Sequence, residues 1–144
     1  MMLKEIRRKV MQIANRLVKH GQVRACAMET AWKLVKAHRL STRVVGASFD
    51  NRQNVLALLA KYAPADVNIQ LVRESANLFD RNTVAVTASV KGKVSAVIGY
   101  LPKAVASVIA VLMDKGYSVH SDTLSIAGGY EGHKNYGARI IVKI

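Results

Sequence analysis

The chain has 144 residues, enough for one domain of ordinary size and too few for two enzymes. Its composition, 51% hydrophobic and 22% charged, excludes intrinsic disorder. The net charge of +13 predicts a polyanionic partner, with nucleic acid ahead of anionic membrane. Because the apolar runs are too short to span a bilayer and no signal peptide is recognisable, we expect a cytoplasmic protein without a membrane partner.

Two amphipathic helices are predicted at the amino end. Apolar residues recur at steps of three and four from Leu3 to Leu17, and Gly21 follows where it can end a helix. A second helical pattern runs from Val23 to His38. It carries the single cysteine, Cys26, which we expect to be a small buried side chain.

This helical hairpin is the more basic part of the chain, since residues 1–40 hold ten Lys or Arg and two acids. We expect it to span residues 1–42, followed by a β-rich domain over 43–144. Three roles are open for it: a charged face above a stripe that packs on the β-domain, a second DNA contact, or an element for protein docking or dimerisation. Under the second role, the side chains that bind phosphates are Arg7, Arg8, Lys9, Arg16 and Lys19.

Short strands rich in Val and Ile follow the hairpin. Two helices interrupt them, at about Asn54 to Tyr62 and Pro102 to Lys115, and Lys91-Gly92-Lys93 joins the third and fourth strands. The fold class is therefore α+β, a small six-stranded barrel-like β-domain with two helices, preceded by an α-hairpin. The expected strands are Arg43 to Phe49, Val67 to Arg73, Thr83 to Val90, Val94 to Leu101, Tyr117 to Ile126 and Ala138 to Ile144.

The sequence lacks recognisable catalytic and metal-binding motifs. No Gly-rich loop leads into Lys-Ser or Lys-Thr, and the four histidines do not have the spacing of a zinc site. Because the acids in the middle of the chain are not spaced as a pair of metal ligands, a metal-dependent nuclease is only a third alternative. We expect no enzymatic activity, no cofactor and no bound metal.

Three segments could carry binding chemistry. Asn77 to Asn82 is a turn rich in Asn and Asp, and Ile98 to Lys103 runs from a strand through Gly into a helix whose amino end can bind an anion. Gly128 to Gly137 is a polar loop, which is either a flexible connection or a mobile flap that brings Tyr130, His133, Lys134 and Tyr136 to nucleic acid.

Together the first two segments resemble the HIRAN domain, which occurs alone in bacterial and phage proteins and joined to chromatin-remodelling helicases in eukaryotes. The resemblance covers about Arg43 to Ile144 and implies a barrel related to OB domains that binds DNA. In the best-understood branch the ligand is the free 3′ end of a single strand. The matching segments are Val44-Val45-Gly46, Leu71-Val72-Arg73-Glu74, Asn77 to Val86, Ile98 to Lys103 and Tyr136 to Ile140.

The resemblance also implies roles for individual residues in the turn and before it. Phe49 and Phe79 would stack on unpaired bases, Asp80 would accept a hydrogen bond from the terminal 3′ hydroxyl, and Asn77 would contact a base edge or the turn backbone. Without a ligand role, Phe49 and Phe79 would belong to the core and Asp80 would cap the turn.

Tyr100 and Lys103 would take phosphates under the same resemblance. Leu78 stands where the family usually has Pro, and Ser48 stands where the branch that binds DNA ends has a basic residue. The leading hypothesis is a non-catalytic module for single-stranded DNA or free 3′ ends, in DNA repair, replication or mobile-element biology. The alternative is a regulator or inhibitor, phage-encoded in one version, that acts on a nucleic-acid-binding partner.

Overall fold

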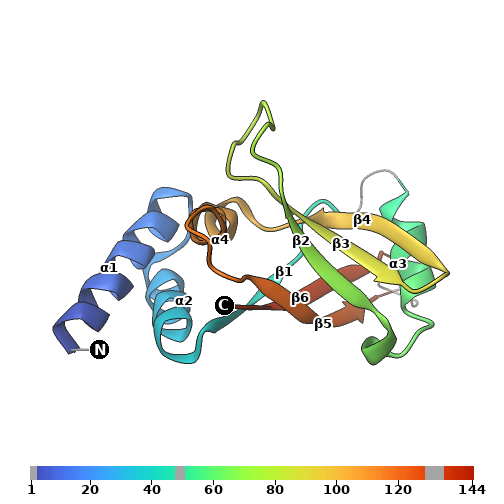
Figure 1. Ribbon diagram of the computed structural model, residues 1–144, viewed down its shortest axis with the longest axis horizontal. Helices are drawn as coiled ribbons and strands as arrows, with labels where there is room; N and C mark the ends of the chain where they lie inside the picture. The colour runs from blue at the N-terminus through green and yellow to red at the C-terminus, as the bar shows by residue number, and fades with distance from the viewer. Residues whose placement is uncertain (1–2, 48–50, 129–134) are drawn as a thin grey trace.

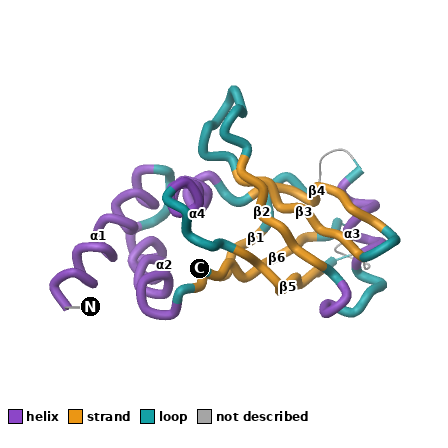
Figure 2. Tube along the Cα trace, in the orientation of Figure 1, coloured by secondary structure: helices purple, strands orange, loops and turns teal. Residues whose placement is uncertain are grey.

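The computed structural model describes residues 3–47, 51–128 and 135–144 (Figure 1). In this part of the chain six strands are combined with four α-helices and one short 3-10 helix (Figure 2). The helices are α1 (Leu3–Lys19), α2 (Arg24–Ala37), α3 (Arg52–Leu59), η1 (Pro64–Asp66) and α4 (Lys103–Asp114). The strands are β1 (Arg39–Arg43), β2 (Asn68–Arg73), β3 (Val84–Val90), β4 (Val94–Tyr100), β5 (His120–Ala127) and β6 (Gly137–Lys143).

The strands form one curled antiparallel sheet in the order β1-β6-β5-β2-β3-β4. Alternate side chains of β1 and β6 point inward, as the period of two requires, so Leu40 and Thr42 of β1 lie opposite Val142 and Ile140 of β6 in the core. The expected α+β class with a six-stranded barrel-like domain is confirmed.

The two edges of the sheet meet just after β1, which gives the sheet its barrel-like form. Val44 donates its backbone N–H to Ala138 of β6 at 2.8 Å, and the next residue, Val45, exchanges two 2.8 Å backbone hydrogen bonds with Tyr100 of β4. Gly99 permits this approach, because a Cβ there would lie 2.4 Å from the Val45 carbonyl oxygen.

Helix α1 of the helical hairpin packs on α4, and α2 contacts β1 at the end of the sheet (Figure 1). Val10, Ala14 and Leu17 of α1 are buried in the same apolar cluster as the barrel interior. A guanidinium nitrogen of Arg16 also donates to the Ser107 carbonyl of α4 at 3.1 Å. The predicted apolar stripe is thus a packing surface, and the hairpin continues the domain core.

Two sequence expectations about this region are wrong. The first strand spans Arg39–Arg43 rather than Arg43 to Phe49, because His38 ends α2 in a left-handed conformation and the chain turns at once into the sheet beside β6. Cys26 is exposed, since it lies on the face of α2 that turns away from the core. The division of the chain at residue 42 stays a prediction. None of the described helices is long and apolar enough to cross a membrane.

Candidate nucleic-acid interface

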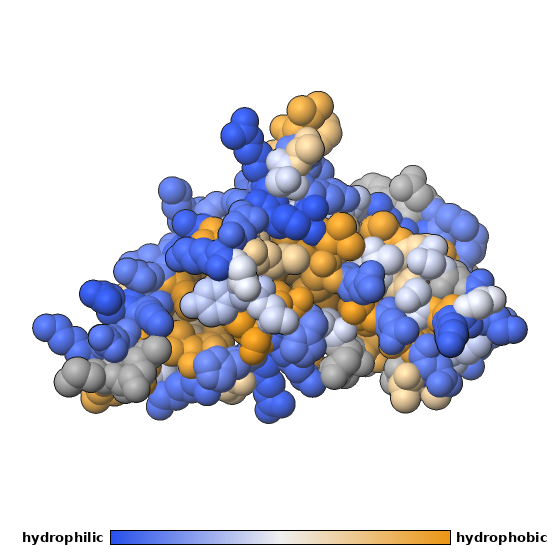
Figure 3. Space-filling view, in the orientation of Figure 1, coloured by the Kyte–Doolittle hydropathy of each residue, from blue (hydrophilic) through white to orange (hydrophobic). Residues whose placement is uncertain are grey.

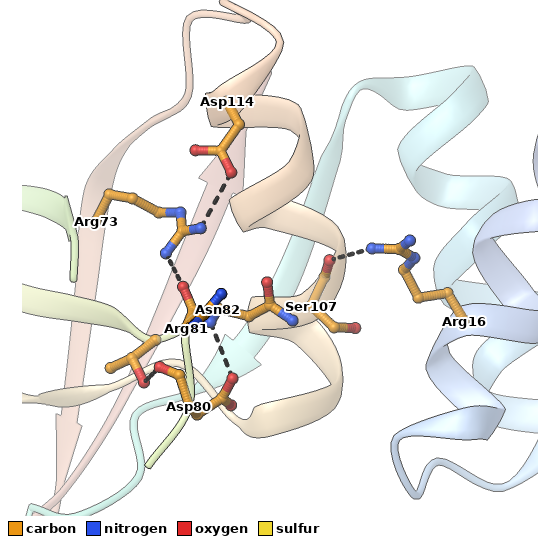
Figure 4. A network of polar contacts seen from close by, with 8 residues as sticks. Arg16, Arg73, Asp80, Arg81, Asn82, Ser107 and Asp114 are labelled. Carbon is orange, nitrogen blue, oxygen red and sulfur yellow. Dashed lines mark hydrogen bonds and ion pairs between the residues drawn. The ribbon is translucent and has the colours of Figure 1, made fainter. Parts of the chain in front are cut away.

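The loop between β2 and β3, residues 74–83, projects from the body of the protein (Figure 1). Its base continues the β2–β3 pairing, because Glu74 donates its backbone N–H to the Thr83 carbonyl at 2.9 Å. Arg73 anchors it, with one guanidinium nitrogen donating to the Arg81 carbonyl and the other 3.0 Å from the Asp114 carboxylate (Figure 4). Since the Arg73 side chain is only 17% exposed, this bridge holds the loop against the end of α4.

Short polar side chains shape the turn of this loop. The Asn77 side-chain oxygen accepts the backbone N–H groups of Phe79 at 2.9 Å and Asp80 at 3.2 Å. The Asn77 amide nitrogen is 3.4 Å from a Glu74 carboxylate oxygen. Asn77 therefore contacts the turn backbone, which was one of the two roles expected for it.

Asp80 caps the second half of the turn and keeps an oxygen for another partner. One carboxylate oxygen accepts the Asn82 backbone N–H at 2.9 Å, and the Asp80 carbonyl accepts the Thr83 hydroxyl at 2.7 Å (Figure 4). Within the described ranges, the second carboxylate oxygen accepts no hydrogen bond. The capping role and a ligand role are thus compatible, because they use different oxygens.

The tip of the loop presents apolar side chains to solvent. Leu78 is 97% and Phe79 is 99% exposed. In the space-filling view an apolar group stands at the outermost point of the loop, above a polar collar (Figure 3). The core alternative for Phe79 is therefore wrong. A fully exposed aromatic ring has no packing role, so it is free to stack on a flat ligand.

The facing wall is built where β4 leads into α4. Tyr100 is the last residue of β4, and the guanidinium carbon of Arg52 lies 5.1 Å from the centre of its ring. Arg52 itself is held by the Gly46 carbonyl at 2.7 Å, which fixes it beside Tyr100. Lys103 is exposed at the first position of α4. An aromatic ring and a cation thus stand together at the amino end of a helix.

The two walls enclose an open depression of about 490 Å³, which we call the loop pocket. Its size is within the range of small-molecule sites. It brings together five residues that the resemblance singled out, although they come from three separate elements. The lining residues are Val45, Asn77, Phe79, Asp80, Thr83, Tyr100, Leu101, Lys103 and Ala106.

The other expected site residues do not line the loop pocket. Arg7, Arg8 and Lys9 are exposed on α1, and Arg16 is bonded to α4. Tyr136 exchanges two backbone hydrogen bonds with the Gln53 side chain at 2.7 and 2.9 Å, and its ring packs on the core. The predictions for Phe49, Tyr130, His133 and Lys134 fall outside the described residues.

Sequence reasoning gave no site role to Arg52 or to Val45, which shape the Tyr100 wall, although Val45 lies in one of the segments that resemble the family. Arg52 lies on a short helix with no motif around it, and Val45 reads as an ordinary strand residue. Their roles depend on closure of the sheet between Val45 and Tyr100, a contact across 55 positions of the chain that leaves no local pattern.

Fold and geometry define the class of this protein as a small OB-like β-domain with an open depression between the β2–β3 loop and the start of α4. The model of the HIRAN domain matches residues 37–142, most of the chain, and the chain belongs to the HIRAN domain family. The predicted family is thus confirmed. HIRAN is a domain that binds DNA and is not itself catalytic, which gives DNA as the partner.

The other comparisons add little. No curated protein matches the chain. A crystal structure of a protein from Lactobacillus plantarum, solved as a structural genomics target, is 22% identical and covers 73% of this chain and 92% of its own, with a TM-score of 0.49. A likeness at this level carries no argument.

Proposed function

We propose that this protein is a non-catalytic module that binds single-stranded DNA and holds a free 3′ end in the loop pocket. The single observation that carries the proposal is the juxtaposition of a fully exposed Phe79 with Asp80, Tyr100 and Lys103 around one open depression. These groups match the parts of a strand terminus, namely a base face, a terminal hydroxyl and a phosphate. Repair, replication and mobile-element systems are the settings that expose such ends.

Each contact follows from the chemistry of the groups. The Phe79 ring stacks on a base, which contributes about 1–3 kcal/mol and does not select one base over another. The second Asp80 carboxylate oxygen accepts a hydrogen bond from the 3′ hydroxyl. Lys103 attracts the phosphate next to it, and the amino end of α4 adds partial positive charge.

Binding of three forms of one strand tests the proposal. The ligand is a single strand of about 12 nucleotides, a length in the range of one OB fold, labelled on an internal base and carrying a 3′ hydroxyl, a 3′ phosphate or a circularised backbone. We expect the tightest binding, by fluorescence anisotropy, for the 3′ hydroxyl form. Equal affinity for all three would overturn the end-recognition clause, and no binding at low salt would overturn the function.

One observation favours a second candidate function, a contact with a protein partner. Leu78 is almost fully exposed beside Phe79, and exposed apolar side chains at a loop tip are typical of protein interfaces. In this role the protein regulates a nucleic-acid-binding partner. A Leu78→Ala variant discriminates the two functions, because it should leave the affinity for DNA nearly unchanged and weaken a protein complex.

A further inference from the structure

A second pocket lies beside the loop pocket, at the junction of the helical hairpin, β1, β6 and the start of α4. It has a volume of about 410 Å³, and we call it the arginine pocket. Its charged side chains are all basic, and no Asp or Glu is among the described residues that line it. Those that matter here are His20, Gln22, Arg43, Lys103 and Arg139.

Arg43 and Arg139 are directly opposite each other in the β1–β6 pairing. Opposite residues of an antiparallel pair share one face of the sheet, and both side chains are exposed. Neither has an ion-pair partner in the described part of the chain. Like charges at such positions destabilise the sheet, so the pair calls for an anion that neutralises it.

Two further groups at the arginine pocket suit a nucleotide. The cap residue of α4, Pro102, makes no side-chain hydrogen bond to the first turn, so the leading N–H groups of the helix stay open beside Ala104 and Val105. The Gln22 side-chain oxygen is buried and has no hydrogen-bond partner among the described residues. The open N–H groups can donate to a phosphate oxygen of a ligand in the pocket, whereas the Gln22 oxygen would have to turn toward the pocket to accept a hydrogen bond from one.

Lys103 lines the arginine pocket and also the loop pocket, so the two are neighbours on either side of one side chain. We infer that the arginine pocket binds the phosphodiester backbone of the strand whose 3′ end occupies the loop pocket, with Arg43 and Arg139 as the phosphate ligands. This inference rests on the proposed function. It also gives the helical hairpin a role, because His20 and Gln22 form one wall of the arginine pocket.

The test pairs a charge change in the protein with a charge change in the strand. The protein variant is Arg43→Gln with Arg139→Gln. The strand of about 12 nucleotides carries neutral methylphosphonate linkages upstream of its last two nucleotides, or natural linkages throughout. For the natural strand we expect the variant to bind roughly tenfold more weakly and the salt slope to fall by about 1.4, at about 0.7 for each lost phosphate contact.

For the neutral strand, wild type and variant should bind alike, because the phosphates that the arginines contact are gone. The matched control, Lys91→Gln with Lys93→Gln, removes the same charge from the exposed β3–β4 turn and should leave the slope nearly unchanged. Arg43→Lys with Arg139→Lys should recover most of the affinity, which separates charge from folding. Thermal unfolding of each variant verifies the fold.

Three results of the variant comparison would overturn the inference. They are an equal loss for natural and neutral strands, an equal loss in the Lys91 and Lys93 control, or no loss in the arginine variant. Failure of the proposed function looks different, since Phe79→Ala would then leave affinity intact and the 3′ group would not matter. If inorganic phosphate or a mononucleotide bound as tightly as the strand, the ligand of the arginine pocket would be a free small anion. That result would overturn the assignment of the pocket to the strand backbone. Absence of all nucleic-acid binding overturns both proposals.

Discussion

The β2–β3 loop and helix α1 both carry apolar side chains in polar surroundings, and they use them in opposite ways. In α1, Leu17 is fully buried in the apolar core, and Arg7, Arg8 and Lys9 face outward. In the loop, Leu78 and Phe79 face solvent, and the backbone is held by Asn77, Asp80 and Arg73. The helix is stabilised by what it buries, whereas the loop keeps its shape through polar contacts and leaves its apolar groups free for a ligand.

The largest expected effect comes from one substitution made in each region. Leu17→Ala should lower the free energy of unfolding by about 2–5 kcal/mol, because it removes buried methyl groups and leaves a cavity. Leu78→Ala, the matched control, should change it by less than about 0.5 kcal/mol. Urea denaturation measures both. A similar loss of unfolding free energy in the two variants would contradict the comparison.

Removing the exposed ring should weaken binding without weakening the fold. Phe79→Ala loses the stacked base, and affinity for single-stranded DNA should fall by about 1–3 kcal/mol, or roughly 5- to 150-fold. Its melting temperature should match that of wild type, since the ring packs on nothing. Phe79→Trp serves as the control and should retain affinity. A large loss of stability in Phe79→Ala would mean that the ring does pack.

Asp80 has both a structural and a proposed binding role, one for each carboxylate oxygen, so a substitution there can separate the two. Asp80→Asn keeps a side-chain oxygen that can accept the Asn82 backbone N–H, but it loses the charged acceptor for the 3′ hydroxyl. Affinity for the strand with a 3′ hydroxyl should therefore fall by about 1–2 kcal/mol. Affinity for a 3′ phosphate strand should rise, because the repulsion is removed. Asp66→Asn removes the same charge at an exposed site outside the loop pocket and is the control. A parallel change for both strands would rule out contact with the end group.

The smallest effect is expected from the outward cations of α1. Arg7, Arg8 and Lys9 are exposed and line neither the loop pocket nor the arginine pocket. Changing all three to Gln should slow association at low salt and change affinity by less than about threefold at 0.15 M, where fields are screened within about 8 Å. Stopped-flow rates at several salt concentrations measure this. A fall of about 2 in the salt slope would instead indicate three direct phosphate contacts.

The sequence alone predicted most of the elements and the family. Hydrophobic periods of 3.6 and 2 are local, so the four helices were found within a few residues, as were five of the six strands. The turn of Asn77 to Asn82 was also predicted, because Asx side chains bond to amides two or three positions away. The family motifs then pointed to the residues that share the loop pocket.

Only the tertiary structure decided which of these residues face a ligand. The exposure of Phe79 depends on how Arg73 fixes the loop to Asp114, a contact across 41 positions. Arg43 lies opposite Arg139 because β1 lies beside β6. Lys103 lines both the loop pocket and the arginine pocket because the start of α4 lies between them. The physical reason is that a local pattern predicts which side chains turn inward, whereas the packing of distant segments determines which outward side chains come together in one site.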